Sequence, residues 1–226
     1  MCGRFNVIDD PSLQQLLREL GIDLDLPSRT NIAPTEAITM VRDQGEGPEA
    51  CEVRWWLTPH WAPQVDQKYS MFNARCESLA TSKAFARPFS KQRGLVPMSS
   101  FIEWRPENGA RQPWLIAAEG DPLMVAALWD VWLGGDIPLL SCTLVTTAAA
   151  KSLEPWHQRM PVMLTRDECE RWLDNALEIA AHDPLFRPEL KFGLSLTPIN
   201  KAVGNSRNKG ADVLVPVGET VLLATS

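Results

Sequence analysis

The sequence lacks the long apolar segments of membrane and exported proteins. No apolar run approaches the roughly 18 residues that a membrane-spanning helix needs, and the amino-terminal segment has no apolar core of signal-peptide length. We therefore expect a cytoplasmic protein of a reducing compartment, with no membrane partner. The chain has 226 residues, 45% of them hydrophobic and 22% charged, which is the composition of a globular protein.

Cysteine is scarce, and its spacing excludes two of its common uses. The five cysteines are an odd, scattered set, which argues against a disulfide framework. No two of them have CxxC spacing, and none of the three histidines lies near a cysteine in sequence. We therefore predict no metal site and no cofactor. Four cysteines are expected to be small buried residues or inert thiols, and only Cys2 stands apart, because of its position.

An excess of basic charge is also missing. The net charge is −6, which argues against a general DNA-binding protein. The charge is uneven, however, since residues 71–111 hold seven Lys or Arg against three acids, and residues 200–210 hold three basic residues and no acid. These segments fit an ordinary solvated surface and equally a local basic groove that contacts a few phosphates.

Hydrophobic patterning predicts an α+β fold. Helically spaced leucines followed by Gly21 predict a helix over residues 11–20, and a capping box of Thr165 and Glu168 predicts another that runs to residue 173. Further short helices are expected within residues 73–89 and 175–181. Apolar and β-branched runs predict strands at residues 37–41, 51–57, 95–104, 113–118, 123–128, 139–147, 161–164, 194–199 and 213–217, with a hairpin turn at 106–109.

The chain shows no sign of division into parts. No internal repeat, low-complexity tract or linker interrupts residues 1–226, so we expect a single domain and a monomer. Its core is predicted to be a curved, mostly antiparallel sheet or barrel, flanked by short helices.

The start of the chain, Met1-Cys2-Gly3, provides a candidate nucleophile. Initiator methionine is usually removed before a small residue, which would leave Cys2 with a free α-amine beside its thiol. The pKa of an α-amine is about 7.7–8, so part of it is neutral and nucleophilic at pH 7. Such an amine condenses with an aldehyde to an imine, and the thiol then closes a five-membered thiazolidine ring. On these three residues alone, an incidental second-position cysteine is the simpler interpretation.

Three other segments carry reactive or cationic side chains. Glu103 lies between Ile102 and Trp104 in a predicted strand, where apolar surroundings would raise its pKa as a general acid requires. His157 lies in a predicted loop, and the Gly- and Asn-rich basic residues 203–210 offer backbone N–H groups and cations to phosphates. Taken singly, each segment is more typical of an ordinary strand, loop or turn.

Taken together, these segments resemble the SRAP family, the abasic-site processing proteins also named SOS-response-associated peptidases. The resemblance covers nearly the whole chain, and eight motifs follow one another in the family's order. They are the MCGR start, NIAP at residues 31–34, WWLTPHW at 55–61, NARCE at 73–77, the Glu103-Trp104 pair, TTAA at 146–149, HQRMP at 157–161 and VGNSRNKG at 203–210.

The resemblance implies a mechanism. Family members bind single-stranded DNA and capture the aldehyde of a ring-opened abasic sugar as a thiazolidine DNA–protein crosslink, which shields the lesion in the DNA damage response. It implies that Cys2 is the nucleophile and that Glu103 assists ring opening and proton transfer. It also implies that His157 assists imine formation and that Asn73 positions the terminal residue by hydrogen bonding. The peptidase name implies self-processing that removes Met1, since no protease triad is evident.

The resemblance also implies how abasic single-stranded DNA, the expected partner, is held. We assign phosphate contacts to Arg4, Arg75, Arg159 and Arg207, and a stacking platform and wedge to Pro34, Trp55, Trp56 and Trp61. Core packing is expected for at least half of the nine tryptophans. Trp56 stands where the family has a glycine, which alters the expected shape of the stacking surface. On DNA, the cytoplasmic protein would be associated with the nucleoid.

Two other functions remain open at this point. An N-terminal-nucleophile cysteine amidohydrolase also begins with MCG, but its thiol attacks an amide. The Arg4-Phe5 pair departs from the Gly-Ile or Gly-Val that typically follows in those enzymes. A non-covalent single-stranded DNA-binding module would use the basic loops and tryptophans alone.

Overall fold

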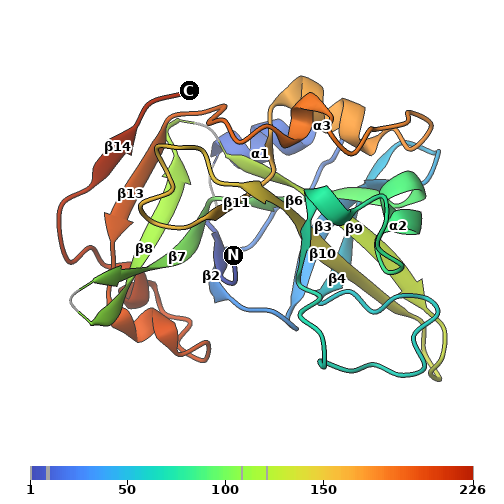
Figure 1. Ribbon diagram of the computed structural model, residues 1–226, viewed down its shortest axis with the longest axis horizontal. Coiled ribbons are helices and arrows are strands. Elements are labelled where there is room, and N and C mark those ends of the chain that lie inside the picture. Colours follow the sequence, from blue (N-terminus) through green and yellow to red (C-terminus); the bar gives the residue numbers. More distant parts are fainter. Residues whose placement is uncertain (1, 9–10, 108, 121, 226) are drawn as a thin grey trace.

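The computed structural model describes residues 2–8, 11–107, 109–120 and 122–225. It contains two β-sheets whose inner faces share one large hydrophobic core (Figure 1). Most paired strands in both sheets are antiparallel, and short helices flank them, as the sequence predicts.

One sheet closes into a five-stranded barrel. Its strands are β3 (Ala37–Asp43), β4 (Pro48–Trp55), β6 (Arg93–Met98), β9 (Leu123–Trp132) and β10 (Leu139–Ala148), and closure arises because β10 pairs with both β4 and β9. All of β6 and most of β9 are buried, which explains their nearly continuous apolar runs. The short strands β5 (Asn73–Arg75), β11 (Arg159–Pro161) and β12 (Met163–Leu164) extend the barrel.

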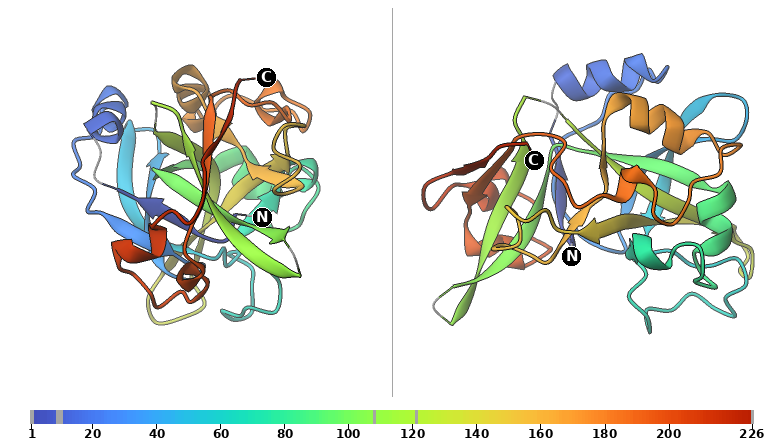
Figure 2. Two further views of the ribbon diagram at one scale, coloured as in Figure 1. Left: turned by 90° about the vertical axis from the view of Figure 1, so that its left-hand side faces the viewer. Right: turned by 45° about the horizontal axis from the view of Figure 1, so that its top comes forward.

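The other sheet has six strands and lies beside one end of the barrel (Figure 2). Its order is β14-β13-β8-β7-β1-β2, from β14 (Val221–Leu223), β13 (Leu194–Pro198), β8 (Ala110–Ala118), β7 (Ser100–Glu107), β1 (Phe5–Val7) and β2 (Arg29–Ile32). The predicted hairpin joins β7 and β8, and Gly109 supplies the positive φ of +77° that the turn requires. Asn108 of that turn lies outside the described residues.

The helices cover the barrel. α1 (Pro11–Glu19) and α3 (Arg166–Leu173) lie on the same side of the molecule, at the top of Figure 1, and α2 (Ala86–Lys91) lies against β6 and β9. The predicted capping box of α3 is present, with the Thr165 N–H donating to Glu168 Oε2 at 2.9 Å. α3 buries Trp172, so its position is fixed by packing as well as by its cap.

A buried arginine joins the ends of two helices. Arg93 is 1% exposed, and its guanidinium donates to the backbone carbonyls of Phe89, Trp172, Asp174 and Leu177. These carbonyls lie at or beyond the carboxyl ends of α2 and α3, where helices leave acceptors unpaired. Arg93 therefore has a structural role.

Short 3₁₀ helices complete the fold. They are η1 (Cys76–Ser78), η2 (Pro184–Phe186), η3 (Lys201–Gly204) and η4 (Ala211–Leu214). A second, smaller apolar cluster of Ile102, Ile199, Val203 and Val213 fixes η3 and η4 against the six-stranded sheet.

Several predicted elements are wrong in detail. Residues 95–104, predicted as one strand, divide between β6 and β7 because the chain passes from one sheet to the other at Ser99, whose Oγ accepts from the Ile8 N–H at 2.8 Å. Residues 161–164 divide between β11 and β12. Residues 175–181 form no helix, because Asn175 is held by the Arg93 N–H. In residues 213–217, η4 ends and the chain continues without a named strand.

The described part of the chain shows no helix with the length and apolar character to span a membrane. The five cysteines are free thiols. Within the described ranges, no group of three or more His, Cys, Asp or Glu side chains is arranged to hold a metal ion. The single domain over residues 1–226 stays a prediction.

Candidate functional site

Cys2 is buried where the two sheets meet. It lies three residues before the start of β1, its side chain is 0% exposed, and its Sγ lies 3.7 Å from the carbonyl oxygen of Arg4. Burial raises the pKa of the Cys2 thiol, and the negative charge of Glu103 raises it further. The thiol is therefore neutral at physiological pH and is not a ready thiolate nucleophile.

Asn73 holds the backbone of Cys2. It is the first residue of β5, which is anchored by parallel pairing with β10, and its Nδ2 donates to the Cys2 carbonyl oxygen at 2.9 Å. Asn73 is 8% exposed, and its Oδ1 has no hydrogen-bond partner among the described residues. A hydrogen bond from Asn73 to Cys2 is thus present, and the positioning role of Asn73 stays a prediction.

Glu103 and His157 form a pair beside Cys2. Glu103 projects from β7 and is 3% exposed, and His157 Nε2 lies 3.9 Å from Glu103 Oε2. Burial raises the pKa of Glu103 to about 7 and lowers the pKa of His157. At neutral pH the carboxyl is therefore poised between its acid and its anion, next to a neutral imidazole.

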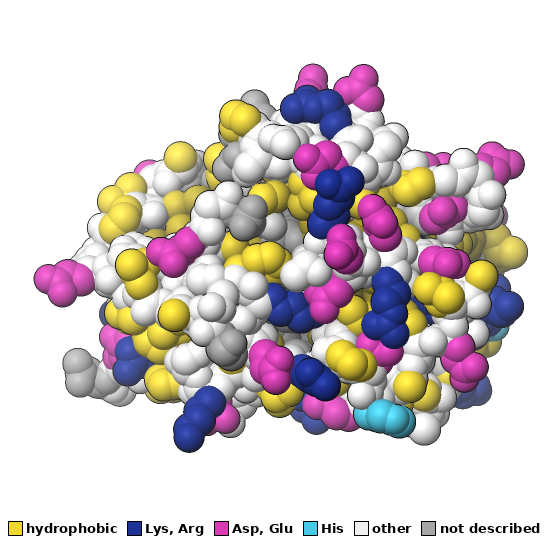
Figure 3. Space-filling model, turned by 90° about the horizontal axis from the view of Figure 1, so that it is seen from above, with side chains coloured by type: hydrophobic (Ala, Val, Ile, Leu, Met, Phe, Trp, Pro, Cys, Tyr) yellow, Lys and Arg dark blue, Asp and Glu magenta, His cyan; other side chains and the backbone are white. Residues whose placement is uncertain are grey.

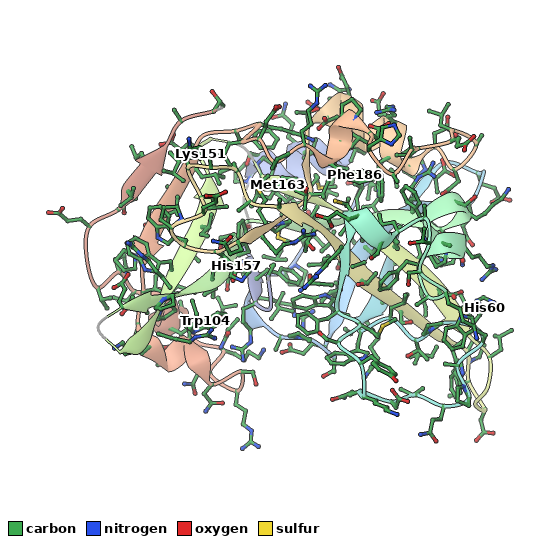
Figure 4. All side chains as sticks on the ribbon, in the orientation of Figure 1. His60, Trp104, Lys151, His157, Met163 and Phe186 are labelled. Carbon is green, nitrogen blue, oxygen red and sulfur yellow. The ribbon has the colours of Figure 1, made fainter. Side chains whose placement is uncertain are left out.

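The orientation of His157 is set by Arg159. Nδ1 lies 2.9 Å from both the amide nitrogen and the carbonyl oxygen of Arg159. These two contacts hold the imidazole ring in place and leave Nε2 as the ring nitrogen that faces Glu103. Figure 4 shows His157 near the centre of the molecule, with Trp104 of β7 to one side and His60 at the far end of the barrel.

Two of the four predicted phosphate-binding arginines are held by the protein itself. Arg4 donates to Asn31 Oδ1 at 2.9 Å and to the Val203 carbonyl at 2.8 Å, and its guanidinium lies 5.7 Å from the Trp104 ring centre. Arg159 forms a bidentate ion pair with Glu77, at 2.5 and 2.9 Å. Their present contacts brace the site.

The other two predicted arginines are exposed. Arg75 ends β5, and Arg207 lies in the loop between η3 and η4. Neither side chain has a hydrogen bond or ion pair with any residue that the structure describes. Both guanidinium groups are thus available to a ligand.

The predicted stacking residues differ in accessibility. Trp55 is 0% exposed, its ring packs edge-on against Phe5 at 5.1 Å, and its Nε1 donates to the Phe72 carbonyl, so no nucleobase can stack on it in this conformation. Trp56 and Pro34 are half-buried, and Trp61 is 42% exposed, although Lys83 Nζ lies 4.3 Å from its ring centre.

The basic loop at residues 203–210 is hydrogen-bonded to β2 and to the residues that follow it. Asn31, held at a positive φ of 53°, donates through Nδ2 to the carbonyls of Asn205 and Asn208 at 3.0 and 2.9 Å. Lys209 Nζ donates to the Asn31 carbonyl at 2.8 Å and to Glu36 at 2.5 Å. Much of the loop's polar capacity is therefore used to fasten it to β2.

Comparison with known proteins identifies the family of the chain. A family model described as SOS response associated peptidase (SRAP) matches residues 1–206. The chain belongs to the SRAP family.

Named relatives of this SRAP protein match most of its length. Abasic site processing protein YoqW of Bacillus subtilis (strain 168) is 32% identical over 182 residues, which cover 77% of this chain and 80% of YoqW. Abasic site processing protein YedK of Escherichia coli (strain K12) is 29% identical over 230 residues, which cover 96% of this chain and 100% of YedK. An X-ray crystal structure of a protein from Bacteroides thetaiotaomicron has the same fold, with a TM-score of 0.78 at 21% identity over 96% of this chain and 100% of that one.

The sequence of this SRAP protein assigns no role to three residues that organise the site. Glu77 holds Arg159, Asn31 holds Arg4, and Trp104 lies against the Arg4 guanidinium. All three lie within the family motifs, so the motifs themselves were the available signal. Their partners are distant in sequence, and only the fold shows which contact each one makes.

Because the pKa of Glu103 is raised, we expect the contribution of this group to the stability of the SRAP protein to fall as the pH rises from about 4.5 to about 7. Below about pH 4.5 the carboxyl is protonated in the folded and the unfolded chain, and between there and about pH 7 only the folded chain keeps the proton. Over this window the free energy of unfolding should fall by up to about 1.4 kcal/mol per pH unit from this group. Denaturant titrations of the wild type and Glu103→Gln give the difference in their free energies of unfolding. This difference should change with pH between about 4.5 and 7 and stay constant at higher pH. A difference that is independent of pH throughout would contradict the raised pKa.

Proposed function

We propose that this SRAP protein is an abasic-site processing protein that bonds covalently to abasic sites in single-stranded DNA through Cys2. The names of YoqW and YedK support the lesion as substrate. The observation that carries the proposal is the assembly of a Glu103–His157 pair, 3.9 Å apart, beside a Cys2 whose carbonyl is held by Asn73. Aldehyde capture needs a positioned nucleophile and a group that exchanges protons near neutral pH, and the bond from Asn73 to Cys2 and the raised pKa of Glu103 support these two roles.

The amine of Cys2 makes the first bond in this proposal. Burial keeps the thiol protonated, whereas an α-amine is partly neutral at pH 7. The amine adds to the sugar aldehyde and loses water to give an imine. The sulfur then adds to the imine carbon, and the thiol proton ends on the nitrogen, which closes the thiazolidine ring.

Glu103 and His157 assist the proton transfers of these steps. As an acid, Glu103 protonates the ring oxygen when the sugar opens and the hydroxyl that leaves as water; as its anion, it accepts the thiol proton during ring closure. His157 faces Glu103 through Nε2. With its proton on that nitrogen, the ring stabilises the carboxylate that each proton donation leaves. Both residues act near the atoms that react.

Removal of Met1 is a condition of this chemistry, because the amine exists only once Cys2 is the first residue. Met1 itself lies outside the described residues. We infer self-processing from the peptidase name of the family. We also expect the protein to act as a cytoplasmic monomer that associates with the nucleoid through DNA.

We place the DNA strand on the side of the molecule away from α1 and α3. Acidic and basic side chains are interspersed on the face that carries these helices (Figure 3), which gives no uniform field for a polyanion. Arg207 belongs to the η3–η4 region on the opposite side in Figure 1, and Arg75 follows Asn73 by two residues. Pro34, Trp56 and Trp61 are the candidates for base contacts.

A denaturing gel tests the proposal. Mixing the wild type with a single-stranded oligonucleotide that carries one abasic site should give a shifted band that survives heat and detergent, because the bond is covalent. The matched control is the same oligonucleotide with a tetrahydrofuran abasic analogue, which has no aldehyde and should give no such band. Without a heat-stable band on the true abasic site, the covalent proposal fails and non-covalent binding remains.

The amidohydrolase alternative is less compatible with the site. Such an enzyme needs the Cys2 thiol to attack an amide, and burial works against formation of the thiolate. A glutaminase assay separates the two functions, and we expect no ammonia release above background.

A further inference from the structure

Arg105 lies on the same side of the sheet as the catalytic carboxyl. It follows Glu103 by two positions on β7, and alternate residues of a strand face the same side about 6.6 Å apart. The antiparallel register places Trp114 of β8 opposite Glu103 and Gln112 opposite Arg105. Arg105 is therefore the next side chain along the face that carries Glu103.

Two tryptophans clamp the Arg105 guanidinium. Its Cζ lies 5.0 Å from the ring centre of Trp156 and 5.8 Å from that of Trp114, and the two rings meet edge-on, with their centres 5.5 Å apart. Trp156 immediately precedes His157, so the clamp adjoins both members of the Glu103–His157 pair. Trp156 and Trp114 are 8% and 7% exposed, which makes them rigid walls.

The clamp leaves the hydrogen-bonding capacity of Arg105 largely unused. The nearest carboxylate oxygen, Glu107 Oε1, is 3.7 Å from Nε, beyond hydrogen-bond length, and it already accepts from Trp114 Nε1 at 3.0 Å. The Arg105 side chain makes no hydrogen bond to any residue within the described ranges, and it is 36% exposed. A planar cation is thus held in place by stacking, with donors open to solvent.

We propose that Arg105, clamped by Trp114 and Trp156, is a phosphate subsite that takes the phosphodiester group next to the abasic sugar. The inference rests on the proposed function and adds to it a residue that fixes where the sugar lies. An arginine fork matches the paired oxygens of a phosphate, and a stacked guanidinium loses little freedom on binding. When that phosphodiester group is bound to Arg105, the adjoining sugar lies at Glu103, two positions away on the same face of β7, and next to Cys2.

The salt dependence of binding tests the proposal. The probe is a fluorescent single-stranded oligonucleotide with a tetrahydrofuran abasic analogue, so binding is measured without covalent capture. Each phosphate contact on a single strand contributes about 0.7 to the slope of log K against log salt. Arg105→Gln should lower the magnitude of that slope by about 0.7 and weaken binding roughly tenfold at low salt. Arg105→Lys should keep the wild-type slope, because it keeps the charge.

Controls separate a phosphate contact from a structural brace. Arg166→Gln removes an exposed arginine of α3 and should leave the slope unchanged. Arg105→Met keeps an apolar stem over the tryptophans, and thermal unfolding shows which variants fold. If Arg105→Gln or Arg105→Met folds and keeps the wild-type slope of log K against log salt, the proposal of a phosphate subsite is wrong. Capture of true abasic DNA by the wild type is scored separately, so failure of the subsite and failure of the proposed function are distinguishable.

Discussion

Replacing Cys2 with alanine should abolish the heat-stable adduct with abasic single-stranded DNA. The variant keeps a terminal amine after loss of Met1, so it can still form an imine, but it has no sulfur to close the ring. An imine hydrolyses when the protein is denatured, whereas a thiazolidine ring survives denaturation without chemical reduction. We therefore expect no band in a plain denaturing gel and a restored band when borohydride reduces the imine before denaturation.

Cys51 provides the matched control for this experiment. It is a half-buried cysteine on β4, its Sγ contacts the Met40 carbonyl, and it has no part in the proposed chemistry. Cys51→Ala should crosslink like the wild type. A reductant-independent adduct in Cys2→Ala would place the bond on another side chain and end the proposed mechanism.

Glu103→Gln should slow adduct formation by about 10²- to 10⁴-fold, the usual contribution of a general acid–base group. The amide keeps the shape of the side chain but cannot exchange protons, so binding to undamaged single strands should stay within about twofold of the wild type. In the wild type, the rate of sugar-ring opening should fall as the pH rises through about 7, because the acid form of Glu103 is lost there. The variant should show no inflection near that pH.

A buried carboxylate in the barrel, on a different sheet from Glu103, is the control for stability effects. Asp130 of β9 is 1% exposed and is held by Arg87 and by the backbone and ring of His60. Asp130→Asn should lower the unfolding temperature yet keep the wild-type pH profile of adduct formation. Equal loss of DNA binding and of adduct formation in Glu103→Gln would mean that Glu103 is structural.

Local sequence patterns predict the helices and strands that depend on interactions between residues close in sequence. α1 is evident from its leucine spacing, and α3 from its capping box and amphipathic pattern. The central barrel strands β6 and β9 are evident from their apolar runs. The passage between sheets at Ser99 is different, because it depends on a hydrogen bond to Ile8, 91 positions away in sequence. No window of residues around Ser99 contains that information.

The candidate site divides in the same way. The residue types and positions of Cys2 and Glu103 make them candidates, but only the family motifs favour them over an incidental cysteine and an ordinary strand residue. The same motifs add Asn73 and His157. The use of each arginine is not predictable, since Arg159 meets Glu77 across 82 positions and Arg4 meets the Val203 carbonyl across 199. Likewise, Trp55 and Trp61 look alike in sequence, and only packing shows that one is core and the other accessible.

The bonds from Arg4 and Asn31 to residues 203–208 have a consequence for how the protein is made. Ribosomes add about 5 to 20 residues per second, so the amino-terminal segment waits roughly 10 to 40 seconds for the residues that lock it in place. Throughout translation the nascent terminus is therefore not yet enclosed. We expect the enclosure of Cys2 to be one of the last events in the maturation of the chain, and the proposed self-removal of Met1 to follow it.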